Sequence, residues 1–288
     1  MKSYAIGLYE KAMPGSMDWR EKLECAKECG YDFVEISIDE TDEKLSRLNW
    51  GTRERLNLIN AMQEIKVPLR SMCLSGHRKY PFGASDPKVR ERSMEIMEKA
   101  IQLADDLGIR IIQLAGYDVY YEPGTKESED LFRENLKKAV FLAASKGIVL
   151  GFETMETEFM NTTRKAMKYV NMVDSPYLGV YPDSGNLTNA ACTYGLSVLD
   201  DLETGRGHIF ALHLKEALPG KFREVPFFTG HVDFRSIIAK AWELGVRRYV
   251  TEMWDVGNSC FMEDIKFACQ RMSAILDQQY SDVHAGIS

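Results

Sequence analysis

A short pattern recurs four times along the 288-residue chain and constrains what it can fold into. Each copy is the end of an amphipathic helix, then a glycine, then a short β-branched or aromatic run. The copies lie at 25–36, 103–114, 142–153 and 240–252, with the glycines at Gly30, Gly108, Gly147 and Gly245. Glycine at this point supplies the left-handed conformation that ends a helix. The run that follows is apolar on both faces, which predicts strands of a parallel sheet.

Extending the pattern predicts eight strands that alternate with eight helices. We expect strands at 4–9, 32–37, 67–74, 109–115, 148–153, 177–182, 208–214 and 247–252. We expect helices at 18–29, 52–65, 87–107, 127–146, 161–173, 195–206, 233–244 and 260–279. Asp86-Pro87 and Asp233 are typical helix-start signals. Strict strand–helix alternation favours a parallel sheet.

Eight repeats of about 36 residues suit a closed (β/α)₈ TIM barrel, and we predict one such domain over residues 1–288. An open, doubly wound sheet is the alternative. It would be favoured by a glycine-rich loop after the first strand, but the segment "LYEKAMPGSMD" contains no G-x-G-x-x-G motif.

Composition narrows the class of protein. The net charge of −7 argues against a nucleic-acid partner, which would need a basic stripe. No apolar run approaches the roughly 20 residues of a membrane span, so no membrane partner is expected. The six cysteines form no C-x-x-C pair, and the N-terminus lacks the pattern of a signal peptide. We therefore predict a reduced, cytoplasmic protein.

Four ionisable residues stand at the ends of four consecutive predicted strands: Glu153, Asp183, His213 and Glu252. A single residue of these types at a strand end is more often a helix cap, an ion-pair partner or a core residue than a metal ligand. In a barrel, however, the C-terminal ends of the strands carry the active site. Three carboxylates that converge there would repel one another unless a cation joins them. Together with one imidazole they suit a divalent Mn, Zn, Co or Mg ion.

Cationic residues fall in the loops of the same rim. His77 and Arg78 follow the third predicted strand, and Lys215 and Arg223 follow the seventh. For any one of them a solvated loop charge is an equal alternative. Several cations around an acidic metal site suggest capture of an anionic substrate group. Asn186, three residues after Asp183, lies in the same region.

Several stretches resemble the L-ribulose-5-phosphate 3-epimerases of bacterial L-ascorbate and pentose utilisation and the related hexulose-6-phosphate isomerases. The matching segments include "LSGHRKYPFGASDP", "IQLAGYDVYYE", "YPDSGNL", "PGKFREVP" and "TEMW". The resemblance implies a xylose-isomerase-like TIM barrel that acts as a homodimer on a small ketose phosphate. It implies one divalent metal held by Glu153, Asp183, His213 and Glu252, with Glu153 and Glu252 as the acid/base pair. Substrate contacts are expected from His77, Arg78, Glu156, Asn186, Lys215 and Arg223.

The chemistry that these residues would support is epimerisation at C3 of a ketose. A metal bound to the C2 and C3 oxygens would stabilise a cis-enediolate. One carboxylate would remove the C3 proton, and the other would return a proton to the opposite face. We therefore predict interconversion of L-ribulose 5-phosphate and L-xylulose 5-phosphate. The alternatives are an aldose–ketose sugar-phosphate isomerase, an endonuclease-IV-like metal hydrolase and a non-enzymatic sugar-phosphate sensor. Five histidines and an acidic charge count against the hydrolase.

Overall fold

The computed structural model describes residues 3–285, and its eight strands form one parallel sheet with the order β6-β5-β4-β3-β2-β1-β8-β7. The strands are β1 Ala5–Tyr9, β2 Phe33–Ile38, β3 Leu69–Leu74, β4 Ile111–Ala115, β5 Val149–Glu153, β6 Leu178–Val180, β7 Leu212–Leu214 and β8 Arg248–Thr251. The sheet closes between β6 and β7 through two isolated parallel bridges, Val180 with Ile209 and Asp183 with His213. The predicted TIM barrel is therefore confirmed.

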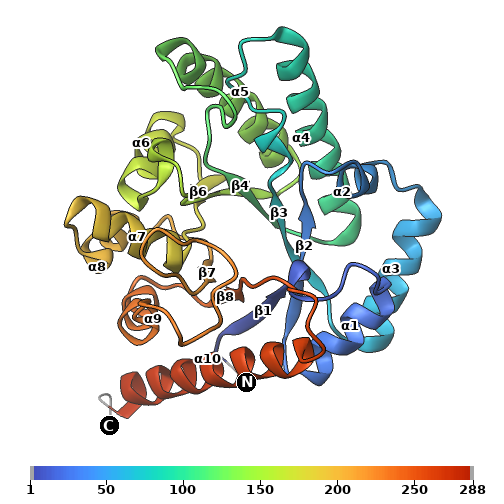
Figure 1. Cartoon of the computed structure of the whole chain (residues 1–288). Coiled ribbons are helices and arrows are strands. Elements are labelled where there is room, and N and C mark those ends of the chain that lie inside the picture. Colours follow the sequence, from blue (N-terminus) through green and yellow to red (C-terminus); the bar gives the residue numbers. More distant parts are fainter. Residues whose placement is uncertain (1–2, 286–288) are drawn as a thin grey trace.

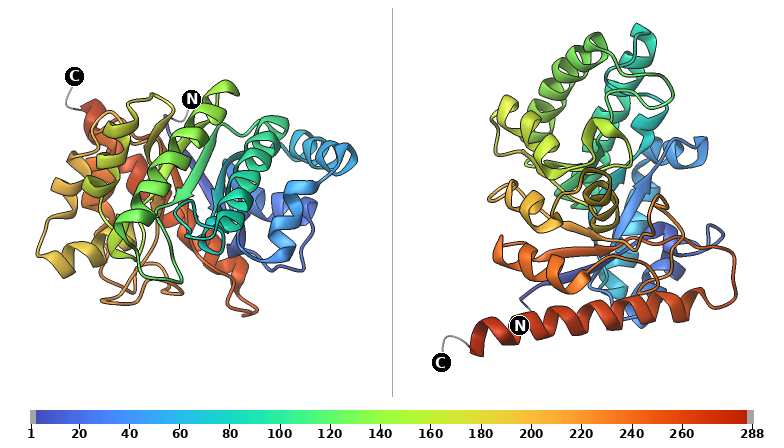
Figure 2. Two further views of the ribbon diagram at one scale, coloured as in Figure 1. Left: turned by 90° about the horizontal axis from the view of Figure 1, so that it is seen from above. Right: turned by 60° about the vertical axis from the view of Figure 1, so that its left-hand side comes forward.

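The helices surround the strands (Figures 1 and 2). They are α1 Trp19–Glu28, α2 Asp42–Ser46, α3 Thr52–Ile65, α4 Pro87–Leu107, α5 Lys126–Ser145, α6 Thr163–Val173, α7 Ser184–Tyr194, α8 Val198–Glu203, α9 Phe234–Glu243 and α10 Phe261–Ala285. The long α10 passes beside the N-terminal region (Figure 1), where the Tyr4 hydroxyl donates to Asp277 Oδ1 at 2.7 Å. Among residues 3–285, no helix has the length and hydropathy required to span a bilayer.

Local signals in the sequence account for most helix boundaries. Asp86 caps α4 by accepting from the backbone N–H of Lys88 at 2.9 Å, and Asp233 caps α9 in the same manner. Gly108 ends α4 with a φ of +74°. Helices α2 and α7 have no counterpart among the helices expected from the sequence, and β6 and β7 are shorter than expected.

Alternation along β2 shows how the core is divided. Val34, Ile36 and Ile38 pack in the large core between strands and helices, whereas Phe33 belongs to the smaller cluster inside the barrel. Successive strand residues point to opposite faces, so Glu35 shares the interior side of Phe33. The barrel interior thus contains a carboxylate, and its upper end leads to the polar residues at the strand termini.

Candidate active site

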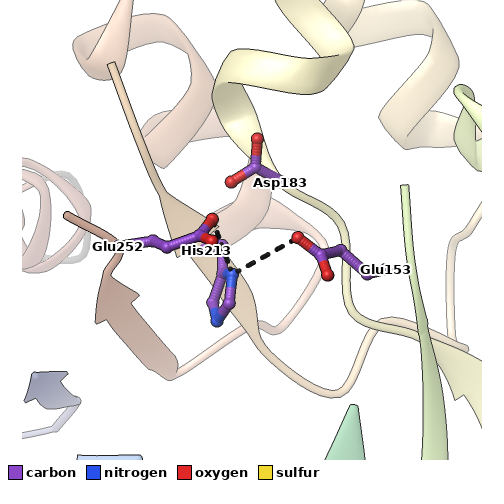
Figure 3. A group of neighbouring side chains, drawn as sticks. All are labelled: Glu153, Asp183, His213 and Glu252. Atoms are coloured by element: carbon purple, nitrogen blue, oxygen red, sulfur yellow. Dashed lines mark hydrogen bonds and ion pairs between the residues drawn. The ribbon is translucent and has the colours of Figure 1, made fainter. Parts of the chain in front are cut away.

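The structure brings Glu153, Asp183, His213 and Glu252 together at the C-terminal rim of the barrel (Figure 3), and we call these four residues the acid ring. Glu153 ends β5, His213 lies in β7, and Glu252 directly follows β8. One potential ligand atom from each residue lies within 4.8 Å of those of the others. All four side chains are buried. In Figure 3, Glu153 and Glu252 approach His213 from opposite sides.

Asp183 is held by the start of α7. One of its oxygens, Oδ1, accepts the backbone N–H of Asn186 at 2.7 Å, which makes Asp183 the N-cap of the helix. Its own N–H donates to Thr154 Oγ1 at 3.0 Å. The other oxygen, Oδ2, is buried and has no hydrogen-bond partner among the described residues. A buried carboxylate oxygen without a donor is costly, so this atom is available for a cation.

His213 is the only imidazole of the acid ring. Its two nitrogens face different carboxylates, and the amide nitrogen of Gln113 lies 3.1 Å from Nδ1 and 3.3 Å from Nε2. Nδ1 lies 3.1 Å from Glu252 Oε2 and 3.8 Å from Glu153 Oε1. Nε2 points the other way and lies 2.6 Å from Glu35 Oε1. Burial alone would lower the pKa of His213, but the charges of Glu35 and Glu252 outweigh burial and raise it well above its usual value.

Lys215 is the cation nearest to the three carboxylates of the acid ring. Its Nζ lies 3.0 Å from Asp183 Oδ1 and 3.3 Å from Glu252 Oε2. Burial would raise the pKa of Glu252, but Lys215 and His213 hold it well below its usual range. Glu153 lacks a comparable partner, so burial and then the charge of Glu252 raise its pKa to about 8. Burial also raises the pKa of Asp183 to about 7.

This donor set fits a divalent metal ion. With all three carboxylates of the acid ring ionised and His213 neutral, as a ligand must be, Lys215 balances one of the three negative charges and leaves two for a divalent ion. Three carboxylate oxygens and one imidazole nitrogen match the ligands of Mn, Co, Zn and Mg better than those of a thiolate-rich structural zinc site. The unpaired Oδ2 of Asp183 is the structural observation that supports this fit.

A cavity of about 60 Å³ lies above the acid ring and is bounded by most of the residues expected to contact substrate. Those that line it are Arg78, Glu156, Asn186, Lys215 and Arg223. Arg223 Nη2 lies 3.2 Å from Glu156 Oε1.

His77 does not line this cavity. It is buried, and its ring Nε2 lies 3.1 Å from the Ser93 carbonyl oxygen of α4. Its ring also packs against Phe82, with 4.5 Å between ring centroids. Burial lowers the pKa of His77 to about 4. The structure therefore places His77 in the packing between β3 and α4 and not on the wall of the cavity.

Arg78 presents its guanidinium to the cavity against a wall of tyrosines. Its Nη2 donates to the Tyr117 hydroxyl at 3.2 Å, and the guanidinium carbon lies 4.9 Å from the centre of the Tyr120 ring. Its Nε is buried without a partner among the described residues. A buried donor of this kind can bind an anion.

Sequence reasoning missed several residues of the site. Tyr9, Lys11 and Trp254 also line the cavity, and Glu35 reaches His213 from below. Lys11 stands two residues beyond the end of β1 and Trp254 three residues beyond the end of β8, which is a signal that the same argument from strand ends could have used. Glu35 has a different signal, namely a carboxylate inside the entirely buried strand "FVEISI".

The loop 217–232, which we call the mouth loop, carries Phe222 and Arg223 over the cavity. It is anchored by the buried carboxylate of Glu216. This carboxylate accepts the backbone N–H groups of Ala217 at 3.0 Å, Phe228 at 2.9 Å and Val232 at 3.1 Å. A Cβ at position 230 would collide with Glu216 Oε1, so the tight approach requires Gly230. The loop is thus fixed at both ends.

A larger hollow of about 450 Å³ also borders Lys215, Glu252 and Trp254. Its wall includes Phe227 and Phe267, and no arginine from the described part of the chain lines it. The arginines therefore lie on the side of the 60 Å³ cavity, which is where an anionic group would be attracted.

Known proteins are similar to this chain over most of its length. The family described as xylose isomerase-like TIM barrel matches residues 23–269. SgbU of Escherichia coli (strain K12), which carries a provisional L-ribulose-5-phosphate 3-epimerase name, is 48% identical over 261 residues, or 88% of this chain and 90% of that protein. The L-ribulose-5-phosphate 3-epimerase UlaE of Escherichia coli O139:H28 is 45% identical over 254 residues, or 88% of each chain.

Solved structures show the same fold at low identity. An L-ribulose 3-epimerase aligns with a TM-score of 0.78 at 16% identity and covers 99% of this chain and 98% of its own. A D-allulose 3-epimerase from Methylomonas sp., in complex with D-allulose, aligns with a TM-score of 0.77 at 18% identity and covers 97% and 98%. The chain belongs to the xylose isomerase-like TIM-barrel family, and within it to the L-ribulose-5-phosphate 3-epimerases.

Proposed function

We propose that this protein interconverts L-ribulose 5-phosphate and L-xylulose 5-phosphate by epimerisation at C3. The observation that carries the proposal is the approach of Glu153 and Glu252 to one point from opposite sides (Figure 3). Inversion at a carbon requires removal of a proton from one face and its return to the other. Two opposed carboxylates can do this, and the 3-epimerase names of the relatives support the same chemistry.

Glu153, Asp183, His213 and Glu252 would hold one divalent ion, for which we propose Mn, Zn, Co or Mg. Such an ion supplies Lewis-acid stabilisation of the negative charge that develops on the sugar oxygens. Lys215 keeps Asp183 and Glu252 in place through its two ion pairs.

One glutamate of the pair removes the C3 proton of a given epimer, and the other protonates the opposite face. Glu153 and Glu252 exchange these roles in the reverse direction, since each faces only one of the two C–H bonds. Both side chains are buried, so bulk water is kept away from the sugar carbon while the protons are transferred.

The phosphate end of the substrate would extend toward Arg78 and Arg223, with Glu156 and Asn186 along the sugar. The cavity of about 60 Å³ is small compared with the roughly 300–1,000 Å³ of typical ligand pockets, and the Arg223–Glu156 ion pair lies on its wall. We therefore propose that Arg223 leaves Glu156 when substrate binds. His77, buried against α4, is not part of the proposed phosphate site.

The test is an NMR assay of purified protein with L-ribulose 5-phosphate in D₂O. Epimerisation predicts L-xylulose 5-phosphate as the product, with deuterium at C3 only. Label at C1 or C2 together with an aldose product would instead establish an isomerase. Absence of turnover on either ketose phosphate, with metal supplied, would refute the proposal.

The phosphate orientation has its own test in Arg78→Gln. A charge-assisted hydrogen bond is worth roughly 1.5–3 kcal/mol, so KM for the phosphorylated ketose should rise about ten- to hundredfold. Activity on free L-ribulose should change little in the same variant. Arg133→Gln, at a helix surface far from the cavity, is the matched control. An unchanged KM in Arg78→Gln would remove this residue from the phosphate site.

We further propose a homodimer in the cytoplasm. The dimer rests on the family resemblance, and the location is supported by six free thiols, four of them buried. Light scattering on a sizing column measures the first, and fractionation of cells measures the second.

A further inference from the structure

Glu35 is a buried carboxylate inside the barrel that the proposed reaction does not use. It lies in the middle of β2 and is fully inaccessible to solvent. Its Oε1 accepts from His213 Nε2 at 2.6 Å. Its Oε2 accepts from two hydroxyls, Ser71 Oγ at 2.6 Å and Tyr181 OH at 2.9 Å. All its described contacts therefore serve to fix one carboxylate plane against one imidazole.

We propose that Glu35 is the positioning residue of the metal centre and acts through His213. Because Nε2–H donates to Glu35, a neutral His213 carries its lone pair on Nδ1, which lies 3.1 Å from Glu252 Oε2, 3.8 Å from Glu153 Oε1 and 3.1 Å from the amide nitrogen of Gln113. A histidine ligand commonly donates its other ring N–H to a carboxylate, which fixes its tautomer and makes it a stronger ligand. This inference rests on the proposed metal site and identifies Nδ1 as the ligand atom.

The cost of placing Glu35 there supports a role beyond packing. A buried carboxylate loses several kcal/mol of hydration, and an apolar residue of the same size would be a cheaper neighbour for Phe33 and Val34. Tyr181 adds to the arrangement because its ring also packs edge-on against His213, with 4.9 Å between ring centroids. Ser71 and Tyr181 thus hold Glu35, and Glu35 and Tyr181 hold the imidazole.

The decisive measurement is the affinity for Mn²⁺ of the chain stripped of metal, titrated against a competing chelator. Glu35→Gln keeps the size of the side chain and an acceptor for Nε2–H but removes the charge. It should bind Mn²⁺ about 10- to 100-fold more weakly than the wild type. Asp201→Asn is the matched control, because Asp201 is also a buried acid and caps α6 far from His213. Because Asp201 does not contact His213, the Mn²⁺ affinity of Asp201→Asn should stay within about twofold of that of the wild type.

A second readout separates positioning from general destabilisation. With Co²⁺ in place of Mn²⁺, the visible absorption bands report the ligand field, so Glu35→Gln should shift them and Asp201→Asn should not. Ser71→Ala and Tyr181→Phe leave Glu35 in place but remove its donors. Each should weaken Mn²⁺ binding in the same direction by a smaller factor. These two variants decide the question if Glu35→Gln does not fold.

The outcomes distinguish the inference from the proposed function. If the wild type binds no divalent metal, both the metal site and the role of Glu35 are wrong. If the wild type binds Mn²⁺ and Glu35→Gln binds it equally well with an unchanged Co²⁺ spectrum, the role of Glu35 is wrong and the metal site stands. If Glu35→Gln does not fold, an unchanged Mn²⁺ affinity in both Ser71→Ala and Tyr181→Phe would overturn the positioning role of Glu35.

Discussion

The acid ring and a second buried charged group, the Glu10 cluster, are built in opposite ways. The Glu10 cluster consists of Glu10, directly after β1, and the cations Lys22, Lys44 and Arg47. Glu10 Oε1 receives Lys22 Nζ at 3.0 Å and Lys44 Nζ at 2.7 Å, and Oε2 receives Arg47 Nη1 at 2.6 Å. The backbone N–H of Ser37 donates to Oε2 at 2.9 Å. One carboxylate is thus surrounded by donors, whereas the acid ring has three carboxylates and few donors.

The pKa values follow this difference. Burial would raise the pKa of Glu10, but Arg47, Lys22 and Lys44 hold it well below its usual range. Burial and then the charge of Glu252 raise the pKa of Glu153 to about 8, and His213 Nδ1 approaches Glu153 only to 3.8 Å. A satisfied group such as Glu10 has nothing left to bind and serves the fold. An unsatisfied group such as the acid ring reduces stability until a cation joins it.

The largest effect should come from removing a base of the acid ring. Glu153→Gln and Glu252→Gln keep the size of the side chain and lose the proton acceptor, so epimerisation should fall by about 10²- to 10⁴-fold. NMR with L-ribulose 5-phosphate measures it. Glu43→Gln, on the exposed side of the Glu10 cluster, is the control and should keep full turnover. Undiminished epimerisation by either acid-ring variant would refute the two-base mechanism.

The Glu10 cluster should respond in stability instead of turnover. Glu10→Gln leaves the buried Lys22 and Arg47 and the partly buried Lys44 without their anion, so the free energy of unfolding should fall by about 3–5 kcal/mol in urea titrations at pH 7. Glu43→Gln, whose carboxylate is 74% exposed and lies 3.9 Å from Lys44, should cost less than about 1 kcal/mol. An equal decrease in the free energy of unfolding in Glu10→Gln and Glu43→Gln would show that the buried and the exposed acid do not differ in their contribution to stability.

Acid should reduce the difference in stability between the wild type and Glu10→Gln. The pKa of Glu10 is lowered in the folded chain, so its contribution is present above its ordinary value of 4.5 and is lost as the pH falls further. The stabilities of the wild type and Glu10→Gln, measured by urea titration, should therefore begin to converge as the pH falls below about 4.5 and should meet only near the much lower pKa of Glu10 in the folded chain.

Metal should stabilise the acid ring and leave the Glu10 cluster unaffected. At 100 times its dissociation constant, a divalent ion adds about 2.7 kcal/mol to the free energy of unfolding. Urea titrations with Mn²⁺ and with chelator measure this increment. It should persist in Glu10→Gln and shrink in Asp183→Asn, which replaces the oxygen that has no partner. The same increment in Asp183→Asn would exclude this residue as a ligand.

The smallest effect tests a third buried group, His77, which has no counter-charge. Burial lowers its pKa from 6.5 to about 4, so it stays neutral in the folded chain. Its contribution to stability is present above pH 6.5 and is lost as the pH falls from 6.5 toward 4. His77→Gln should therefore lose less stability than the wild type between pH 7 and pH 5. Identical pH dependence in the two proteins would show that His77 does not titrate as described.

Much of the fold was predictable because its signals are local. Gly108 ended α4 and Asp86 began it, as the sequence indicated. Helix α7 was missed because Asp183 was interpreted only as a strand-end ligand, although it is also the helix cap. The strands β6 and β7 are shorter than predicted because closure there uses isolated bridges instead of a continuous ladder.

Parts of the site were not predictable because they depend on distant residues. Glu35 meets Ser71, Tyr181 and His213, which are 36, 146 and 178 positions away along the chain. No spacing rule links such positions. His77 shows the opposite case: its type and loop position suggest substrate contact, whereas its ring packs against Phe82 and the Ser93 carbonyl oxygen and does not line the cavity.

Because Glu216 anchors the mouth loop, the residues that set the path of its backbone differ from the residues that face the cavity. Glu216 and Gly230 set the path of the backbone, whereas Phe222 and Arg223 at the tip face the cavity. Substitutions at the tip can therefore accumulate during evolution, or be introduced by a protein engineer, without altering the frame that supports them. A library confined to positions 221–225 would vary the preference for sugars of different length and would leave the barrel and the acid ring unchanged.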